Sequence, residues 1–367
     1  MIRWTREQRE LRGALLGMEQ ALNGEDKWKA VRELGISGLP FDDRFGGLGR
    51  DLPTTMYVLE GLGYVCRDAG LSFSVTTHLV STGVPLHFFG SPELQERFLP
   101  AVCAGDRIGA HAISEPEAGS DMLAMRTTAK EDGDHLILNG SKAFVSNGPI
   151  ADLFVVYAKT DPNAGPFGLT AMVVERDTPG LTVGNPIPKV GLTSSPLAEL
   201  FFDDCRVPLD NVIGTVGAGF AVFDHVMKWE IVCSFIVNVG EMQRRLESAV
   251  DYAKRRKQFG QPIGAFQAVA HRIVDMRIAV DTARRALYDA ALRLDAGEDC
   301  TVDIAIAKIV ASEGNLNSAI AAVRTFGGYG VMTEYGIEEG VRDALAGTIY
   351  SGTSDIQRNR IAAEMGL

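Results

Sequence analysis

The chain of 367 residues is 46% hydrophobic and 23% charged, which is typical of a folded globular protein and excludes a disordered one. That length is too great for one ordinary hydrophobic core and predicts two or three domains. The formal net charge of -11 argues against non-specific binding of nucleic acid. The sequence has no apolar run long enough to span a membrane, and its charged N-terminus lacks the apolar stretch of a signal peptide. We therefore expect a cytoplasmic protein that does not cross a membrane.

The cysteines are scattered, without a CxxC pair, and no histidine stands at metal-ligand spacing. This pattern predicts free thiols in a reducing compartment and no metal site. The five cysteines are Cys66, Cys103, Cys205, Cys233 and Cys300.

Residues 1–108 are expected to form a helical domain. Apolar residues near the start recur at helical spacing, at Trp4, Leu11, Leu15, Met18 and Leu22. Three further apolar stretches continue this pattern, at 59–64, 75–84 and 94–102. A glycine-rich loop at 45–49 interrupts the helices, and Pro40 and Pro53 bracket it.

Residues 109–214 are expected to form a compact, barrel-like β domain. The run 136–138 leads into Asn139-Gly140, a strong hairpin signal. Further short β-rich runs lie between Asp, Gly and Pro turns, at 153–157, 169–174 and 200–202.

Residues 215–367 are expected to form an antiparallel four-helix bundle. Long stretches carry apolar residues at helical spacing, and short connections favour antiparallel neighbours. Three faces are predicted: Met242, Leu246, Val250 and Ala253; Val269, Ile273, Met276, Val280, Ala283 and Leu287; and Ile306, Ile309, Val310, Ile320 and Val323. The basic cluster 254–257 fits either the C-terminus of a helix or a phosphate contact.

Two loops rich in small residues carry most of the functional information. Residues 114–121 read Ser-Glu-Pro-Glu-Ala-Gly-Ser-Asp, and residues 139–148 read Asn-Gly-Ser-Lys-Ala-Phe-Val-Ser-Asn-Gly. Glycines and short hydroxyl side chains let a backbone approach a flat polar ligand closely. The pair resembles the flavin-binding signatures of the acyl-CoA dehydrogenase family, and the resemblance extends from the loop at 45–49 to the segment 350–358.

The resemblance implies an α+β, mostly α, fold, with FAD as cofactor and α,β-dehydrogenation of an acyl thioester as the reaction. The family's loop glutamate base is replaced here by a serine, in Tyr350-Ser351-Gly352-Thr353. Glu230 lies where isovaleryl-CoA and long-chain members carry the base on a helix. We therefore expect Glu230 to remove the α-proton, with its pKa raised by apolar neighbours. The Ser351 backbone N–H is expected to stabilise the thioester oxygen, which leaves the Ser351 hydroxyl dispensable.

The same resemblance assigns the flavin contacts by position. The ring contacts are Ile113, Ser114, Gly119, Phe144 and Ser146. Contacts that reach a neighbouring subunit's FAD are Arg256, Phe259 and Gln267, which implies a homodimer or homotetramer. The remaining positions are Arg324, Gly327, Gly328, Thr353 and Asp355, where Arg324 and Asp355 depart from the usual residues.

The substrate positions that match the family are Ser120, Lys228 and Ile231. The last two replace an aspartate and an arginine that hold the carrier arm in CoA-using members. This change favours a thioester on an acyl carrier protein, as in polyketide or peptide assembly, while CoA stays open. The electron acceptor is either an electron-transfer flavoprotein or O2. We expect no additional C-terminal domain.

Two other classes also fit parts of the sequence. A flavin-dependent oxygenase on the same scaffold, such as an N-hydroxylase, needs no carboxylate base, so Ser351 alone fits it. A non-catalytic acyl-binding protein that keeps FAD structurally is the other. Glu230 and the retained serine pattern favour the dehydrogenase.

Overall fold

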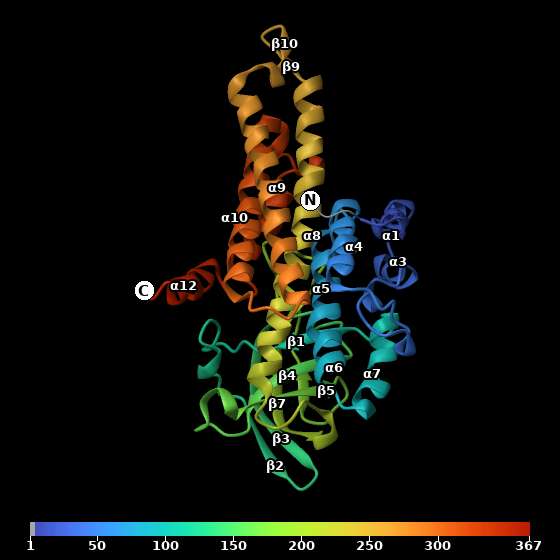
Figure 1. Ribbon diagram of the computed structural model, residues 1–367, viewed down its shortest axis with the longest axis vertical. Helices are drawn as coiled ribbons and strands as arrows, with labels where there is room; N and C mark the ends of the chain where they lie inside the picture. The colour runs from blue at the N-terminus through green and yellow to red at the C-terminus, as the bar shows by residue number, and fades with distance from the viewer. Residues whose placement is uncertain (1–3) are drawn as a thin grey trace.

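The computed structural model describes residues 4–367. The molecule is elongated, with a helical bundle at one end, a sheet at the other and the N-terminal helices beside their junction (Figure 1). In this described part, no helix combines the length and the apolar character that crossing a membrane requires.

The N-terminal region is helical, as the sequence predicts. Its helices begin at side-chain caps: Asp51 accepts from Thr54 N, and Ser91 accepts from Leu94 N. A π-helical turn, η3, separates α5 from α6. The elements are α1 (Arg6–Gly17), α2 (Glu19–Leu22), α3 (Lys27–Glu33), α4 (Leu52–Val65), α5 (Ala69–His78), η3 (Leu79–Gly83), α6 (Val84–Phe89) and α7 (Pro92–Ala104).

The middle region is one eight-stranded sheet with the order β6-β7-β3-β2-β4-β5-β8, and β1 pairs with β4. In the described chain the end strands β6 and β8 are not joined, so the sheet is open where the sequence predicts a barrel. The strands are β1 (Gly109–Ala112), β2 (Thr128–Asp132), β3 (His135–Ser146), β4 (Leu153–Lys159), β5 (Leu169–Glu175), β6 (Leu181–Val183), β7 (Leu197–Pro208) and β8 (Val212–Ile213).

The predicted hairpin at Asn139-Gly140 is wrong, because β3 runs straight through these residues. The chain reverses earlier, where Asp132 pairs with His135 around Gly133. Gly140 instead lets Thr127 pack close to the backbone of β3. Its φ is 143°, and a Cβ at this position would lie 2.6 Å from Thr127 Oγ1. The ladder to β7 shifts register at this point, so the glycine marks a bulge.

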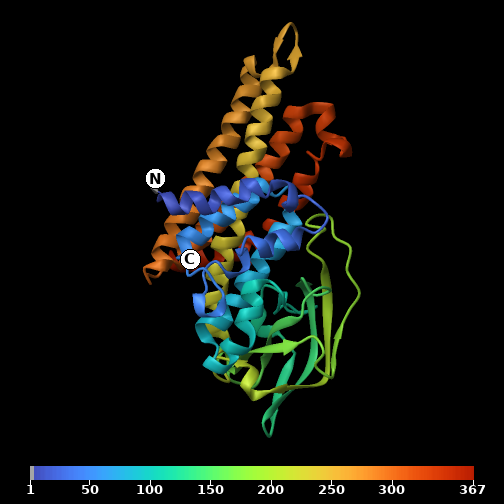
Figure 2. The same cartoon turned by 90° about the vertical axis from the view of Figure 1, so that its right-hand side faces the viewer.

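Both faces of the sheet's centre are buried, which explains why β4 and β5 are continuous apolar runs. Leu153, Val155 and Tyr157 face the helices and belong to the main core. Phe154 and Val156 face a second core enclosed by the sheet. Figure 2 shows the strands on one side of this half of the molecule and the N-terminal helices on the other.

The C-terminal region consists of three long helices with shorter helices packed on them. The helix α8 passes from the sheet into the bundle and packs closely against α4. Glycine at position 63 permits this approach, since a Cβ there would lie 2.0 Å from Val237 O. The elements are α8 (Gly219–Arg255), β9 (Lys257–Gln258), β10 (Gln261–Pro262), α9 (Gln267–Asp295), α10 (Thr301–Phe326), α11 (Glu339–Gly347) and α12 (Ser354–Glu364).

The predicted apolar face of α10 is wrong. Ile306 is 44% exposed, and the buried face consists mainly of small and polar residues, such as Ala311, Ser312, Asn315 and Ala319. Because α10 packs against α8, α9, α11 and α12, small side chains are needed where the helices approach one another. A count of large apolar residues at helical spacing therefore selects the wrong face.

Candidate active site

The two glycine- and serine-rich loops are joined directly. The amide of Ala143 donates to Ser114 O at 2.8 Å, and the Lys142 ammonium donates to Ile113 O at 3.0 Å and to Glu115 Oε1 at 2.8 Å. Glu115 also accepts from the amides of Arg126 and Thr127. The segments that the sequence singles out as a pair therefore form one structural unit.

The ion pair that joins these loops is buried. The Lys142 side chain is fully enclosed, and the Glu115 side chain is 6% exposed. Burial lowers the pKa of Lys142 to about 8 although Glu115 opposes the shift. Burial raises the pKa of Glu115, but Lys142 and the backbone donors outweigh it and bring that pKa below its ordinary value. Both groups are thus held by mutual attraction in a site from which water is excluded.

Asn147 anchors the end of the second loop to the rest of the molecule. Its side-chain amide donates to Ser74 O at 3.0 Å and to Gly109 O at 3.2 Å, and its oxygen accepts from the Ser74 hydroxyl. Asn147 is fully buried with a positive φ of 64°. The loop is therefore fixed to α5 and β1 before any ligand binds.

The predicted ring contacts lie on this unit. Phe144 has a φ of 57° and is 66% exposed, an unusual position for a bulky aromatic residue. Ser146, two residues further along the chain, is partly exposed, as are Ile113 and Ser114 on the joined first loop, and Gly119 is exposed. An exposed aromatic face next to fixed hydroxyl groups fits a flat, polar-edged ring such as isoalloxazine.

Glu230 lies where α8 passes the π-helical turn, β1 and the loop before α12. Its Oε1 accepts from Ser351 Oγ at 2.5 Å, and its Oε2 accepts from Ser81 Oγ at 3.2 Å. His111 Nδ1 lies 3.7 Å from the same Oε2. The Glu230 side chain is 13% exposed, so three elements fix it without sealing it. Ser81 belongs to the π-helical turn, and such turns are frequent at functional sites.

The expected rise in the Glu230 pKa is wrong. Burial raises the pKa, but the neighbouring His111 and the hydroxyl donors of Ser351 and Ser81 outweigh it and bring the net pKa below its ordinary value. The apolar neighbours in sequence do not surround the carboxylate, because Ile231 and Val232 point into the core. The carboxylate is therefore ionised at neutral pH, which is the form that a base requires.

Ser351 contributes through both its backbone and its side chain. Its φ of 56° is left-handed, and the following Gly352 has a φ of 79°. Gln357 Nε2 donates to Ser351 O at 3.0 Å and holds this turn. Within residues 4–367 the Ser351 N–H has no acceptor, so it is available to a ligand. The hydroxyl is not idle, contrary to expectation, because it donates to Glu230.

Replacing Ser351 tests this hydroxyl. We expect Ser351→Gly to slow flavin reduction about tenfold, the effect of one charge-assisted hydrogen bond. Glycine adopts the left-handed conformation without strain, which makes it a cleaner change than alanine. Loss of the donor raises the Glu230 pKa, so the acid limb of the rate profile moves to higher pH. Anaerobic stopped-flow measurements over a range of pH values check both the slower flavin reduction and the shifted acid limb. An acid limb at the same pH as in the wild type would contradict this role of the hydroxyl.

A second group of predicted contacts lies at the far end of the bundle. Arg256, Gly327 and Gly328 line a cavity of about 600 Å³, and Arg256 lies over the Tyr329 ring at 5.7 Å. Lys254 and Arg255 lie in the last turn of α8, as the helix-terminus interpretation predicts, and Arg256 lines this cavity, where the phosphate contact stays a prediction. Exposed positions nearby are Phe259, Gln267 and Arg324.

The remaining predicted contacts lie at the start of α12. Thr353 is its N-cap and accepts from Ile356 N at 3.1 Å. Asp355 pairs with Arg358 on the surface at 3.1 Å. The predicted substrate positions are separated: Ser120 is exposed, Lys228 pairs with Asp224 at 2.7 Å, and Ile231 is 1% exposed in the core. Ile231 therefore offers no polar contact to a carrier arm.

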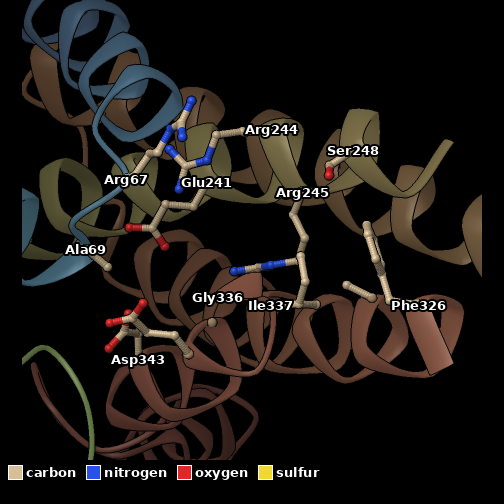
Figure 3. A pocket seen from close by; sticks show the side chains of 13 residues that line it. Arg67, Ala69, Glu241, Arg244, Arg245, Ser248, Phe326, Gly336, Ile337 and Asp343 are labelled. Carbon is tan, nitrogen blue, oxygen red and sulfur yellow. The ribbon is translucent and has the colours of Figure 1, made fainter. Parts of the chain in front are cut away.

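A charged cavity of about 370 Å³ lies farther along α8. Figure 3 shows the carboxylates of Glu241 and Asp343 and the guanidinium of Arg245 turned into the same space. Burial raises the pKa of Glu241 to about 7 and lowers that of Arg245 to about 10. Arg245 also donates to Asn315 Oδ1 at 2.9 Å. Glu241 lies eleven residues, about 16 Å, beyond Glu230 along the helix. This charged cluster is therefore separate from the surroundings of Glu230.

Four functional neighbours were missed from the sequence. Lys142 and Asn147 lie in the loop segment 139–148. Each is a polar residue among buried neighbours, and this was the pattern that could have identified them. Ser81 and His111 come from other elements. Only the fold brings them to Glu230, so no local pattern could have identified them.

Comparison with known proteins covers the whole chain. Three families match in order: "Acyl-CoA dehydrogenase, N-terminal domain" at residues 8–106, "middle domain" at 110–205 and "C-terminal domain" at 217–366. The chain is similar to an L-prolyl-[peptidyl-carrier protein] dehydrogenase of Serratia sp., at 41% identity over 95% of this chain and 91% of the relative.

Two solved structures are similar over their full lengths. The prolyl acyl carrier protein oxidase AnaB has a TM-score of 0.97 at 39% identity, with 100% of both chains covered. PigA with FAD and proline has a TM-score of 0.95 at 37% identity, covering 100% of this chain and 99% of that one. Joined loops, a helix-borne carboxylate and these similarities agree: the chain belongs to the acyl-CoA dehydrogenase family and is an FAD-dependent oxidoreductase that dehydrogenates an acyl thioester.

Proposed function

We propose that this enzyme oxidises a small, amine-bearing acyl group, of the L-prolyl type, held as a thioester on a carrier protein, with Glu230 as the base. The observation that carries the proposal is the Glu230 carboxylate, ionised and held by Ser81 and Ser351 beside the turn that lacks the usual glutamate. The similarity to L-prolyl-carrier dehydrogenases supports the substrate class.

Glu230 takes the α-proton of the thioester. Its oxygens are oriented by Ser351 on one side and Ser81 on the other, so the base is positioned before substrate arrives. The negative charge that develops on the thioester oxygen is stabilised by the Ser351 N–H, whose left-handed turn presents it away from the helix.

When bound, FAD accepts the hydride from the β-carbon. Phe144, Ser114 and Ser146 would hold its ring, and the distal cavity, with Arg256, would hold the phosphates of a neighbouring subunit's FAD. The loops need no rearrangement to do so, since Lys142 and Asn147 already fix them.

The surroundings of Glu230 favour a small and polar acyl group. The rings of Phe73 and Phe235 lie 4.7 and 5.1 Å from the ring of Tyr350, which precedes Ser351 in the chain. We infer that this aromatic cluster disfavours a long alkyl chain. Ser81 and His111 give the site a polar wall that suits a ring nitrogen better than methylene groups.

A carrier protein is favoured as the tether by the charge near Glu230. Lys228 is engaged with Asp224, and Ile231 is buried, so the arginine used by CoA-dependent members has no equivalent at these positions. Loss of that contact weakens recognition of free CoA, whereas a carrier protein supplies its own docking surface.

A homodimer or homotetramer completes the cofactor site in this proposal. Phe259 is 93% exposed at the β9–β10 tip, which projects beyond the bundle (Figure 1). Apolar residues on the outer bundle surface are also exposed, among them Val274, Ile278 and Ile306. Exposed apolar residues on the bundle together with an exposed aromatic tip fit contact with a second copy.

We expect Arg256→Ala to weaken FAD binding at least about tenfold, because the cavity loses its phosphate-facing cation. Reconstitution of the apoprotein followed by flavin fluorescence measures this. Lys254→Ala is the matched control, since it removes an exposed cation from the same cluster. Equal FAD affinity in both variants would contradict the assignment.

Sedimentation velocity tests the proposed homodimer or homotetramer directly.

The substrate proposal is tested by anaerobic flavin reduction with four thioesters. Prolyl-carrier protein should bleach the flavin fastest, prolyl-CoA more slowly, and the butyryl and octanoyl thioesters least. Faster reduction by octanoyl-CoA would overturn the proposal. Formation of a flavin C4a-hydroperoxide without thioester oxidation would instead support an oxygenase.

A further inference from the structure

Glu230 has a histidine beside it that the dehydrogenation as described does not use. His111 stands on β1 with its side chain 10% exposed, and Nδ1 lies 3.7 Å from Glu230 Oε2. Its Nε2 has no hydrogen-bond partner within residues 4–367. The Tyr157 ring packs edge-on against the imidazole at 5.3 Å, and the Tyr157 hydroxyl is likewise buried without a partner in that range. A buried imidazole that faces a carboxylate and has no other bond is free to exchange a proton.

We propose that His111 is a positioning and proton-accepting partner of Glu230, which takes over the substrate α-proton and returns Glu230 to its carboxylate form. The inference rests on the proposed role of Glu230 as the base. The α C–H bond breaks and its proton bonds to a Glu230 oxygen, while the β-hydride leaves in the established reaction. The O–H bond then breaks, an N–H bond forms at His111 Nδ1, and product release returns this proton to solvent.

The geometry supports the transfer. Nδ1 faces Oε2 at 3.7 Å, and when the neutral ring carries its proton on Nε2, the Nδ1 lone pair can accept the proton from Oε2. A contraction of less than about 1 Å brings the two atoms to hydrogen-bond distance, as commonly occurs when substrate closes a site.

The direction of transfer follows from relative basicity. A typical imidazole is more basic than a typical carboxylate by about two pKa units. Donors lower the Glu230 pKa further, although burial opposes them. The other ionisable groups close to the pair are Tyr157 on β4 and Tyr350 before α12, and burial raises both of their pKa values. Both phenols therefore stay neutral, and the pair behaves as a two-group system.

The test is where the proton resides after reduction. Anaerobic holoenzyme is mixed with prolyl-carrier protein, and infrared difference spectra are recorded for wild type, His111→Gln and Glu230→Gln. Glutamine keeps the approximate shape and a donor but cannot accept the proton. We expect wild type to show no carboxylic-acid band, and His111→Gln to gain one and to reduce flavin about tenfold more slowly.

Controls separate the possible failures. Ser81→Ala removes a donor to the same oxygen without removing a proton acceptor, and His225→Gln removes another histidine of the site's helix. Neither should gain the carboxylic-acid band. A carboxylic-acid band in wild type, or its absence in a folded His111→Gln variant, overturns the relay, and the wild-type spectrum decides even if the variant folds poorly. Undiminished reduction by Glu230→Gln would instead overturn the base itself.

Discussion

Glu230→Gln is expected to retain FAD and to lower the rate of flavin reduction by thioester by about 10²–10⁴-fold, the contribution of a positioned general base. The amide is the same size and can still accept from Ser81 and Ser351, so the fold has no reason to change. Only proton abstraction is lost. Anaerobic stopped-flow absorbance measures the rate, and the visible spectrum reports bound FAD.

The pH dependence of the wild-type enzyme adds a second check. The donors around Glu230 bring its pKa below its ordinary value although burial opposes them, so the base stays ionised down to acidic pH. The rate should therefore fall only as pH drops through that lowered pKa, below the ordinary value of 4.5. A fall that begins near neutrality would show that another group removes the proton.

Lys142→Met is expected to destabilise the protein by about 3–5 kcal/mol, because it leaves the Glu115 carboxylate buried without its partner cation. It should also weaken FAD binding, since Lys142 joins the two loops that carry the ring contacts. Urea unfolding at pH 7 and flavin retention measure the two effects. Lys130→Met, at an exposed position on β2, is the matched control and should change neither.

The direction in which the destabilisation by Lys142→Met changes with pH distinguishes an unpaired Glu115 carboxylate from a simple loss of packing. In the wild type the Glu115 pKa is lowered, so its stabilising contribution is complete above the unfolded-state value and disappears as pH falls through the folded-state value. In Lys142→Met the unpaired carboxylate can be neutralised by protonation. The difference in unfolding free energy between variant and wild type should therefore shrink from pH 7 toward pH 4. A constant difference would identify a packing defect.

Much of the fold and site follows from local patterns in the sequence. Helices were identified where apolar residues recur at helical spacing, as in 94–102, and strands where short apolar runs lie between turns, as in β4 and β5. The two loops that the sequence pairs do lie together, joined by Ala143 N to Ser114 O and by Lys142 to Ile113 O, and their common ligand stays a prediction. These features are short-range, so spacing suffices to find them.

What the sequence does not predict depends on contacts between distant segments. The residue types of Asn139-Gly140 are typical of a hairpin turn. In the fold, however, Gly140 packs against Thr127 and the strand continues through it with a bulge. The pKa direction of Glu230 depends on Ser81, His111 and Ser351, which lie 149, 119 and 121 residues away along the chain. Neighbours in sequence suggest an apolar site, whereas neighbours in space make it polar.

The most direct test of the central claim is flavin reduction by prolyl-carrier protein under anaerobic conditions, compared between wild type and Glu230→Gln at equal FAD content. The helix-borne base predicts rapid bleaching of the wild-type flavin and almost none in the variant. Equal bleaching of both proteins would contradict it, because the proton would then leave the substrate without the carboxylate that Ser81 and Ser351 hold in place.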